Sequence, residues 1–134
     1  MITGNIIRSS TLTLEDTARG QELAAQICPA APLGDEPAHP ILNALDDLGM
    51  DAQLDAWGMI HVGAGSEPEI SPGCYEVLRR LLAALAPDAH AEHPRLEDAR
   101  IEWRHGADEN QLWCWAFHNG AMREETGHVA YTAS

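Results

Sequence analysis

The sequence predicts a single α+β domain: an antiparallel β-meander, made of the three C-terminal strands plus one or two earlier ones, with about three helices packed on one side. Three observations support this prediction. The last third of the chain contains Asn119-Gly120, the residue pair most typical of a two-residue hairpin turn. Ser71-Pro72 is a typical helix start, and apolar residues follow it at helical spacing. The length of 134 residues suits one domain that buries a core without disulfides or metals.

The first part of the chain is predicted to contain a strand and a helix. Residues 4–12 are rich in β-branched side chains and are predicted to form the first strand. Thr13 follows as the expected N-cap of a helix, with Asp16 three residues further on. This helix is expected to run to about Ile27, because apolar residues recur on one stripe of it.

The middle of the chain is predicted to contain a loop, a helix and a strand. Residues 29–40 hold four prolines and indicate a loop that lies within the single domain 1–134. Pro40 suits the first position of a helix, which Gly49 is expected to end. From Gln53 to Val62 the apolar residues recur at every second position, so we predict one strand there.

The C-terminal part is predicted to form three consecutive antiparallel strands. Their expected ranges are 99–105, 111–118 and about 121–131. The middle strand is apolar on both faces, which is typical of a central strand, and we expect it to be buried.

The charge composition restricts the class of partner. The chain has no lysine, and its eight arginines stand against twenty-one acidic residues, for a formal net charge of -13. This excess argues against nucleic acid as a direct ligand and favours a basic protein partner. The lack of lysine has two explanations, the codon usage of a GC-rich genome or selection against positive surface, and the sequence leaves both open.

Composition also bears on the compartment. The longest apolar run is too short to span a membrane, and the first residues do not resemble a cleaved signal peptide. The three cysteines have no tight pair spacing, which favours reduced thiols over a disulfide framework. We therefore expect a cytoplasmic protein that has no membrane partner.

One group of acidic residues is a candidate binding surface. Asp46, Asp47, Asp51 and Asp55 occur within ten residues with no basic residue among them, and Trp57 follows directly. We expect the four aspartates to lie at one corner of the fold, and we expect these four side chains and Trp57 to dock on a basic protein surface.

A catalytic or metal-dependent function is the alternative. Cys74 lies in the first turn of the predicted helix, where a thiol pKa is lowered, and His61 is a candidate base for it. His105, Cys114 and His118 lie on paired strands and are candidate metal ligands. Neither group has the local sequence of a known catalytic or zinc motif, so we expect no enzyme activity, no metal and no cofactor.

These observations lead to a hypothesis about function. The sequence favours a non-catalytic acidic protein that binds and inhibits, or neutralises, a basic protein such as a nucleic-acid-binding effector or a toxin. Small anti-defence proteins of phages and mobile elements, including anti-CRISPR proteins, share this profile of one compact, acidic domain without an active-site motif. Immunity proteins that neutralise basic toxin nucleases share it as well. The likeness is one of composition only.

Overall fold

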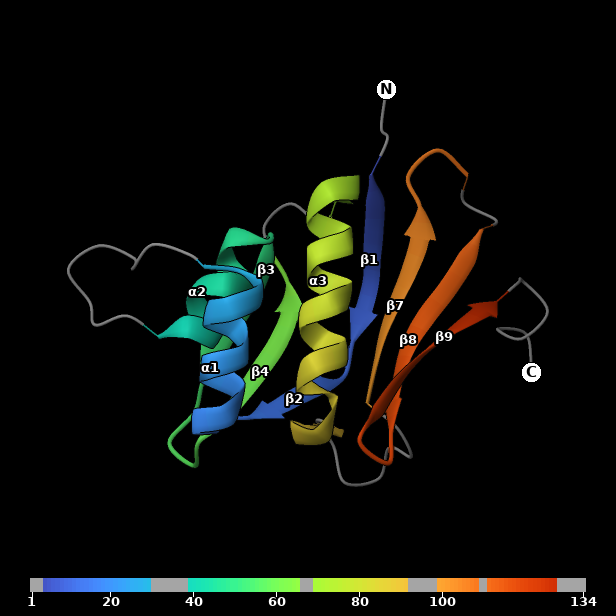
Figure 1. Cartoon of the computed structure of the whole chain (residues 1–134). Helices are drawn as coiled ribbons and strands as arrows, with labels where there is room; N and C mark the ends of the chain where they lie inside the picture. The colour runs from blue at the N-terminus through green and yellow to red at the C-terminus, as the bar shows by residue number, and fades with distance from the viewer. Residues whose placement is uncertain (1–3, 30–38, 66–68, 92–98, 109–110, 128–134) are drawn as a thin grey trace.

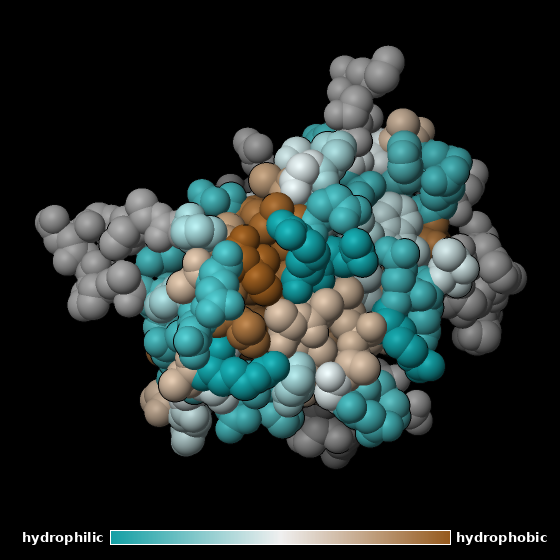
Figure 2. Space-filling view, viewed as in Figure 1, coloured by the Kyte–Doolittle hydropathy of each residue, from teal (hydrophilic) through white to brown (hydrophobic). Residues whose placement is uncertain are grey.

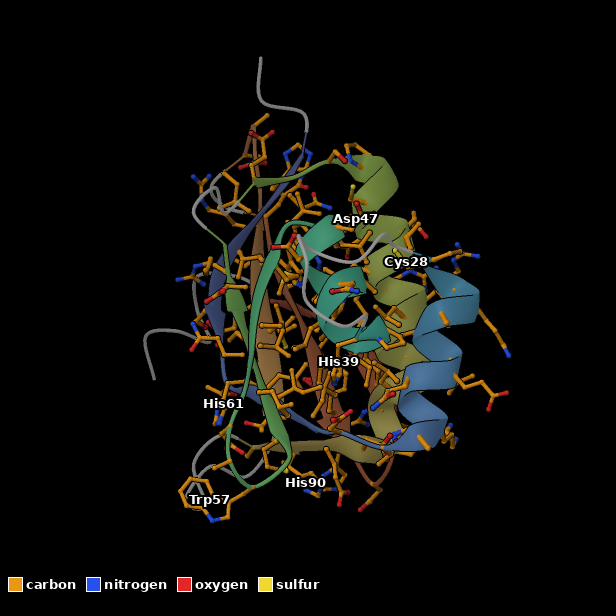
Figure 3. The ribbon with its side chains drawn as sticks, turned by 90° about the vertical axis from the view of Figure 1, so that its left-hand side faces the viewer. Cys28, His39, Asp47, Trp57, His61 and His90 are labelled. Atoms are coloured by element: carbon orange, nitrogen blue, oxygen red, sulfur yellow. The ribbon has the colours of Figure 1, made fainter. Side chains whose placement is uncertain are left out.

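The computed structural model describes residues 4–29, 39–65, 69–91, 99–108 and 111–127, and within them the chain forms two layers. Three α-helices form one layer and two antiparallel sheets form the other (Figure 1). Seen from the side, all three helices lie on the same side of the sheets (Figure 3). The predicted α+β domain with helices packed on one side is therefore confirmed.

The larger sheet contains the predicted C-terminal meander. Asn119 and Gly120 have φ angles of 53° and 77°, as a type I′ hairpin turn requires. Residues beyond Gly127, up to the predicted strand end at Tyr131, lie outside the described residues. In spatial order the five strands are β5 (Glu69–Ile70), β1 (Asn5–Ser10), β7 (Ala99–His105), β8 (Leu112–His118) and β9 (Ala121–Gly127).

The central position of β8 explains why both of its faces are apolar. Cys114 and Ala116 lie on one face, Trp115 and Phe117 lie on the other, and all four are buried. The expected burial of this strand is therefore confirmed for these residues.

The smaller sheet has four strands. The chain passes into it from the larger sheet at Thr11, between the end of β1 and the start of β2. In spatial order the strands are β3 (Met50–Leu54), β4 (Met59–Ala64), β2 (Leu12–Glu15) and β6 (Ala89–Ala91).

The prediction of one strand over residues 53–62 was wrong, because this segment is a hairpin. The two strands β3 and β4 pair across a turn at residues 55–58, in which Gly58 has a φ of +82°. Leu54 pairs with Ile60 and Ala52 pairs with Val62, so even-numbered residues face the helices on both strands. The period of two therefore continues through the turn, and the pattern is the same as that of one straight strand.

The predicted start of the first helix was also wrong. Thr13 is buried within β2, and Leu12 and Leu14 on either side of it belong to the core, so the segment is a strand and not the start of a helix. The helix α1 (Ala18–Ile27) has Thr17 as its N-cap, and the Thr17 Oγ1 accepts a hydrogen bond of 2.9 Å from the Gly20 N–H.

The other two helices begin where the sequence predicts. The helix α2 (Pro40–Asp47) has proline in its first turn, and Gly49 follows it with a φ of +92°. The helix α3 (Pro72–Leu85) has Ser71 as its N-cap and ends in a short 3₁₀ turn (Ala86–Asp88). Most of the predicted loop 29–40, residues 30–38, lies outside the described residues. None of the described helices is long and apolar enough to cross a membrane.

The core lies between the two layers. The four leucines Leu78, Leu81, Leu82 and Leu85 of α3 are almost completely buried against both sheets. Figure 2 shows the helix side, where apolar side chains are visible between the helices and polar ones cover most of the remaining face. The opposite face of the sheets carries no described helix, although Cys114 and Ala116 on that face of β8 are buried.

Candidate functional site

The four tryptophans fall into two groups. Trp103 and Trp115 are fully buried and Trp113 is half-buried, and all three pack around Tyr75 with ring centroids 5.0 to 6.3 Å from its own. Trp57 is different, because 86% of it is exposed.

The polar atoms of the buried aromatic cluster are mostly paired with one another. Trp113 Nε1 donates a hydrogen bond of 2.9 Å to the Tyr75 hydroxyl, which donates one of 3.0 Å to Glu124. Trp115 Nε1 donates to the same Glu124 oxygen at 3.3 Å. Burial raises the pKa of Tyr75 to about 12, so the hydroxyl keeps its proton at neutral pH. These contacts give the cluster a structural role and leave Trp57 as the candidate for binding.

Trp57 lies on a turn that is held in shape by the Asp55 carboxylate. Asp55 Oδ1 accepts hydrogen bonds from the backbone N–H groups of Trp57 and Met59, at 2.8 and 3.0 Å. Its Oδ2 lies 2.8 Å from His61 Nε2. The hydrogen bond from His61, with those from the two backbone groups, holds the pKa of Asp55 below its usual value. The turn is therefore fixed before any partner arrives.

The turn is also tied to the rest of the sheet. The backbone N–H of Asp16, just after β2, donates a hydrogen bond of 2.9 Å to the Gly58 carbonyl. The Asp55 N–H donates one of 2.9 Å to the Met59 carbonyl and closes the hairpin. A rigid turn that exposes an aromatic ring loses little conformational entropy when the ring is buried by a partner.

A second apolar side chain is exposed beside Trp57. Leu54, the last residue of β3, is 42% exposed, and among the described residues these two are the exposed large hydrophobic side chains. Exposed apolar groups gathered at one place are typical of interaction sites, whereas isolated ones are ordinary.

Three of the predicted acidic residues are exposed and have no ionic partner among the described residues. Asp46 and Asp47 lie in the last turn of α2, and Asp51 lies in β3. None of the ion pairs in the described part of the chain involves them. Asp46 and Asp47 also face the negative end of the α2 dipole, which disfavours acidic groups. Asp47 Oδ2 also accepts a hydrogen bond of 3.9 Å from the Cys28 thiol.

The predicted site residues form a stripe and not a single corner. Asp51 and Asp55 lie at the two ends of β3, which spans about 13 Å between them at about 3.3 Å per residue. In Figure 3, Asp47 lies in the upper part of the molecule and Trp57 lies at its lower end. An extended strand therefore separates Asp55 from the other three aspartates, although all four are close in sequence. We call these residues and Leu54 the β3 stripe: Asp46, Asp47, Asp51, Leu54, Asp55 and Trp57.

The structure does not bring the candidate Cys74–His61 pair together. Ile60 and Val62 of β4 point into the core, so His61 points to the opposite face of the sheet, away from the helices (Figure 3). Cys74 belongs to α3 and packs against the core on the helix side. The sheet therefore lies between the two side chains.

The candidate metal ligands are separated as well. Cys114 and His118 lie on one face of β8 and are four residues, or about 13 Å, apart. Trp103 of β7 points to the helix side, and His105 lies two residues later in the same strand. His105 therefore also points to the helix side, away from Cys114. Within the described residues no three or more metal-binding side chains lie together. Burial raises the pKa of Cys114, and burial and then Asp47 raise that of Cys28, which disfavours the reactive thiolate in both.

The outer face beside β3 has one further feature. Gly63 of β4 leaves an open depression of about 220 Å³, lined by Ser10, Asp51, Gln53, His61, Val62 and Gly63.

No family model, no curated protein and no solved structure matches this chain. The candidate site therefore rests on the geometry of the β3 stripe.

Proposed function

We propose that this protein is a non-catalytic acidic binding protein that occupies a basic surface of another protein and thereby inhibits or neutralises it. The observation that carries the proposal is Trp57, which is 86% exposed on a turn that Asp55 holds rigid. Tryptophan is among the residues that contribute most to protein–protein affinity when a partner buries it.

The charges along the β3 stripe favour a basic partner. The chain has a net charge of -13, and Asp46, Asp47 and Asp51 have no ionic partner in the described structure. An arginine of a partner can stack on the indole ring and can also form paired hydrogen bonds to a carboxylate. The acidic stripe would speed association with a basic surface and set its orientation.

The proposed partner is a nucleic-acid-binding effector or a toxin, because proteins that bind nucleic acid carry basic surfaces. The inhibitor would then be of the anti-defence or immunity type. The proposed encounter takes place in the cytoplasm, since Cys28, Cys74 and Cys114 are all free thiols.

The test is affinity capture with three forms of the protein in parallel. The site variant carries Asp46→Asn, Asp47→Asn, Asp51→Asn and Trp57→Ala. The control variant removes the same number of charges from exposed acidic residues elsewhere, by Glu22→Gln, Glu76→Gln and Glu125→Gln. We expect the parent and the control variant to capture a basic protein that the site variant does not capture.

The captured protein is then purified, and its activity and association rate are measured against the salt concentration. The parent should inhibit that activity. The three Asp→Asn substitutions without the tryptophan change should slow association and flatten its salt dependence. Equal capture by the site and control variants, or a captured protein whose activity is unchanged, would contradict the proposal.

A further inference from the structure

We propose that the partner binds through an extended segment that pairs with the free edge of β3 as an additional antiparallel strand, with basic and apolar residues in alternation. This inference rests on the proposed function and names the binding mode of the same site.

The edge of β3 is open in the described structure. β3 is the last strand of the order β3-β4-β2-β6, and no described strand pairs with its outer side. Figure 3 views the molecule from this side. An exposed edge strand offers unpaired backbone groups, and proteins usually block such edges with lysine or proline. β3 has neither, and its one charged residue is Asp51.

The hydrogen-bond register shows which backbone groups are free. The Asp55 N–H donates to the Met59 carbonyl, so these two residues form a hydrogen-bonded pair of the antiparallel ladder. Hydrogen-bonded pairs alternate along such a ladder. The N–H and C=O groups of Ala52 and Leu54 therefore point away from β4, toward the position of an added strand.

The side chains along this edge indicate what the added strand should carry. Ala52 and Leu54 face the helix side, where Leu54 is 42% exposed, so apolar residues of the added strand would cover them. Asp51 and Gln53 face the outer side, beside the depression over Gly63. Basic residues of the added strand would face Asp51 there. An added strand that complements both faces would therefore carry basic and apolar residues in alternation.

Trp57 lies at the end of this edge, where the added strand would meet the hairpin turn. In this mode, backbone hydrogen bonds supply general affinity, and the alternate side-chain positions supply specificity. The exposed indole would cover the end of the added strand and exclude water from its last hydrogen bonds.

The experiment uses a defined probe, an eight-residue peptide of alternating arginine and valine that is blocked at both ends. A peptide of the same composition, with the arginines and valines in two blocks, is the control for charge alone. Two further analogues carry N-methyl groups on all valines or on all arginines. In an antiparallel pair, residues opposite Ala52 and Leu54 share their face and direct their N–H groups toward them. The N–H groups of the valines are therefore the ones that donate hydrogen bonds to the backbone of β3.

We expect the alternating peptide to bind more tightly than the block peptide. N-methylation of the valines should weaken binding about tenfold or more, because each hydrogen bond lost contributes about 1 kcal/mol. N-methylation of the arginines should have little effect. On binding, the backbone amides of Ala52 and Leu54 should become protected from hydrogen exchange. The amide of Gln53, which already pairs with β4, should be protected in the free protein as well.

The outcomes separate this inference from the proposed function. If both N-methylated peptides bind as well as the parent peptide, or Ala52 and Leu54 stay unprotected, the added strand does not form. The same conclusion follows if the alternating peptide does not bind. The proposed function would still stand if capture of a basic partner depends on the β3 stripe. Because the decisive changes are in the peptide, the folding of a protein variant does not affect the result.

Discussion

Replacement of Trp57 by alanine should reduce partner binding strongly and leave the stability of the fold almost unchanged. The reason is the unusual exposure of this side chain, 86%, on a turn whose shape is set by the Asp55 carboxylate and not by the indole. We therefore expect the substitution to cause a small loss of folding stability and a large loss of affinity for the partner.

The magnitudes follow from the buried areas. A tryptophan side chain presents about 200 Å². The fold covers about 30 Å² of Trp57, which contributes about 0.7 kcal/mol to stability at about 25 cal/mol per Å². A partner that covers the rest would gain at most about 4 kcal/mol, and interface tryptophans commonly contribute about 2 kcal/mol or more. The expected loss of affinity is thus about thirtyfold to a thousandfold.

The assay pairs urea denaturation with a binding titration on the same protein samples. Trp115→Ala is the matched control, because Trp115 is fully buried and its removal should cost about 3 to 5 kcal/mol of stability. A Trp57→Ala variant that is destabilised by more than about 2 kcal/mol would show that the indole is part of the core. A variant that binds the partner as tightly as the parent would show that the indole is not an anchor.

Three further predictions concern the groups that support the fold and the turn. Thr13→Val should stabilise the protein by about 1 kcal/mol in urea denaturation, because the Thr13 Oγ1 is buried and has no hydrogen-bond partner among the described residues; a loss of stability would reveal a partner. Asp55→Ala should increase amide hydrogen exchange at Trp57 and Met59 at neutral pH. The pKa of Asp55 in the folded protein lies below the usual 3.8, so the carboxylate stabilises the turn fully above pH 3.8, and this stabilisation is lost as the pH falls through the lowered pKa. If the amides of Trp57 and Met59 in the parent protein stay protected from exchange in strong acid, this prediction is contradicted. Tyr75→Phe should cost about 1 kcal/mol. Since the pKa of Tyr75 is raised from 10.0 to about 12, the stability that the neutral hydroxyl contributes is complete below pH 10 and is lost as the pH rises from 10 toward 12, so the parent should lose its advantage over the variant within that range.

Elements that depend on local chemistry were predicted correctly. Ser71 caps α3 and Asn119-Gly120 forms the hairpin turn, because a side-chain cap and two positive φ angles are properties of a few adjacent residues. Thr13 shows the limit of such reasoning. It has the side chain of an N-cap, but Leu12 and Leu14 bury the segment as a strand, and Thr17 caps the helix in its place.

The hairpin over residues 50–64 shows a second limit. Its register pairs even-numbered residues with even-numbered residues, so one alternating pattern runs through both strands. The period of two specifies the buried face, but it does not specify whether the chain continues or turns back. The local features that favour the turn are Gly58, which has a positive φ, and Asp55, whose carboxylate accepts hydrogen bonds from the turn backbone.

By itself, the sequence determined the net charge of -13, the starts of α2 and α3, the C-terminal meander and the group of acidic residues that precedes Trp57 in the chain. Only the tertiary structure decided that Trp57 is exposed while Trp103 and Trp115 are buried. It also decided that Asp55 holds a turn, whereas Asp51 forms no ion pair with another described residue. It also decided that His61 and Cys74 lie on opposite sides of a sheet. The physical reason is that exposure and pairing depend on strand register and on the packing of layers, which join residues distant in the chain.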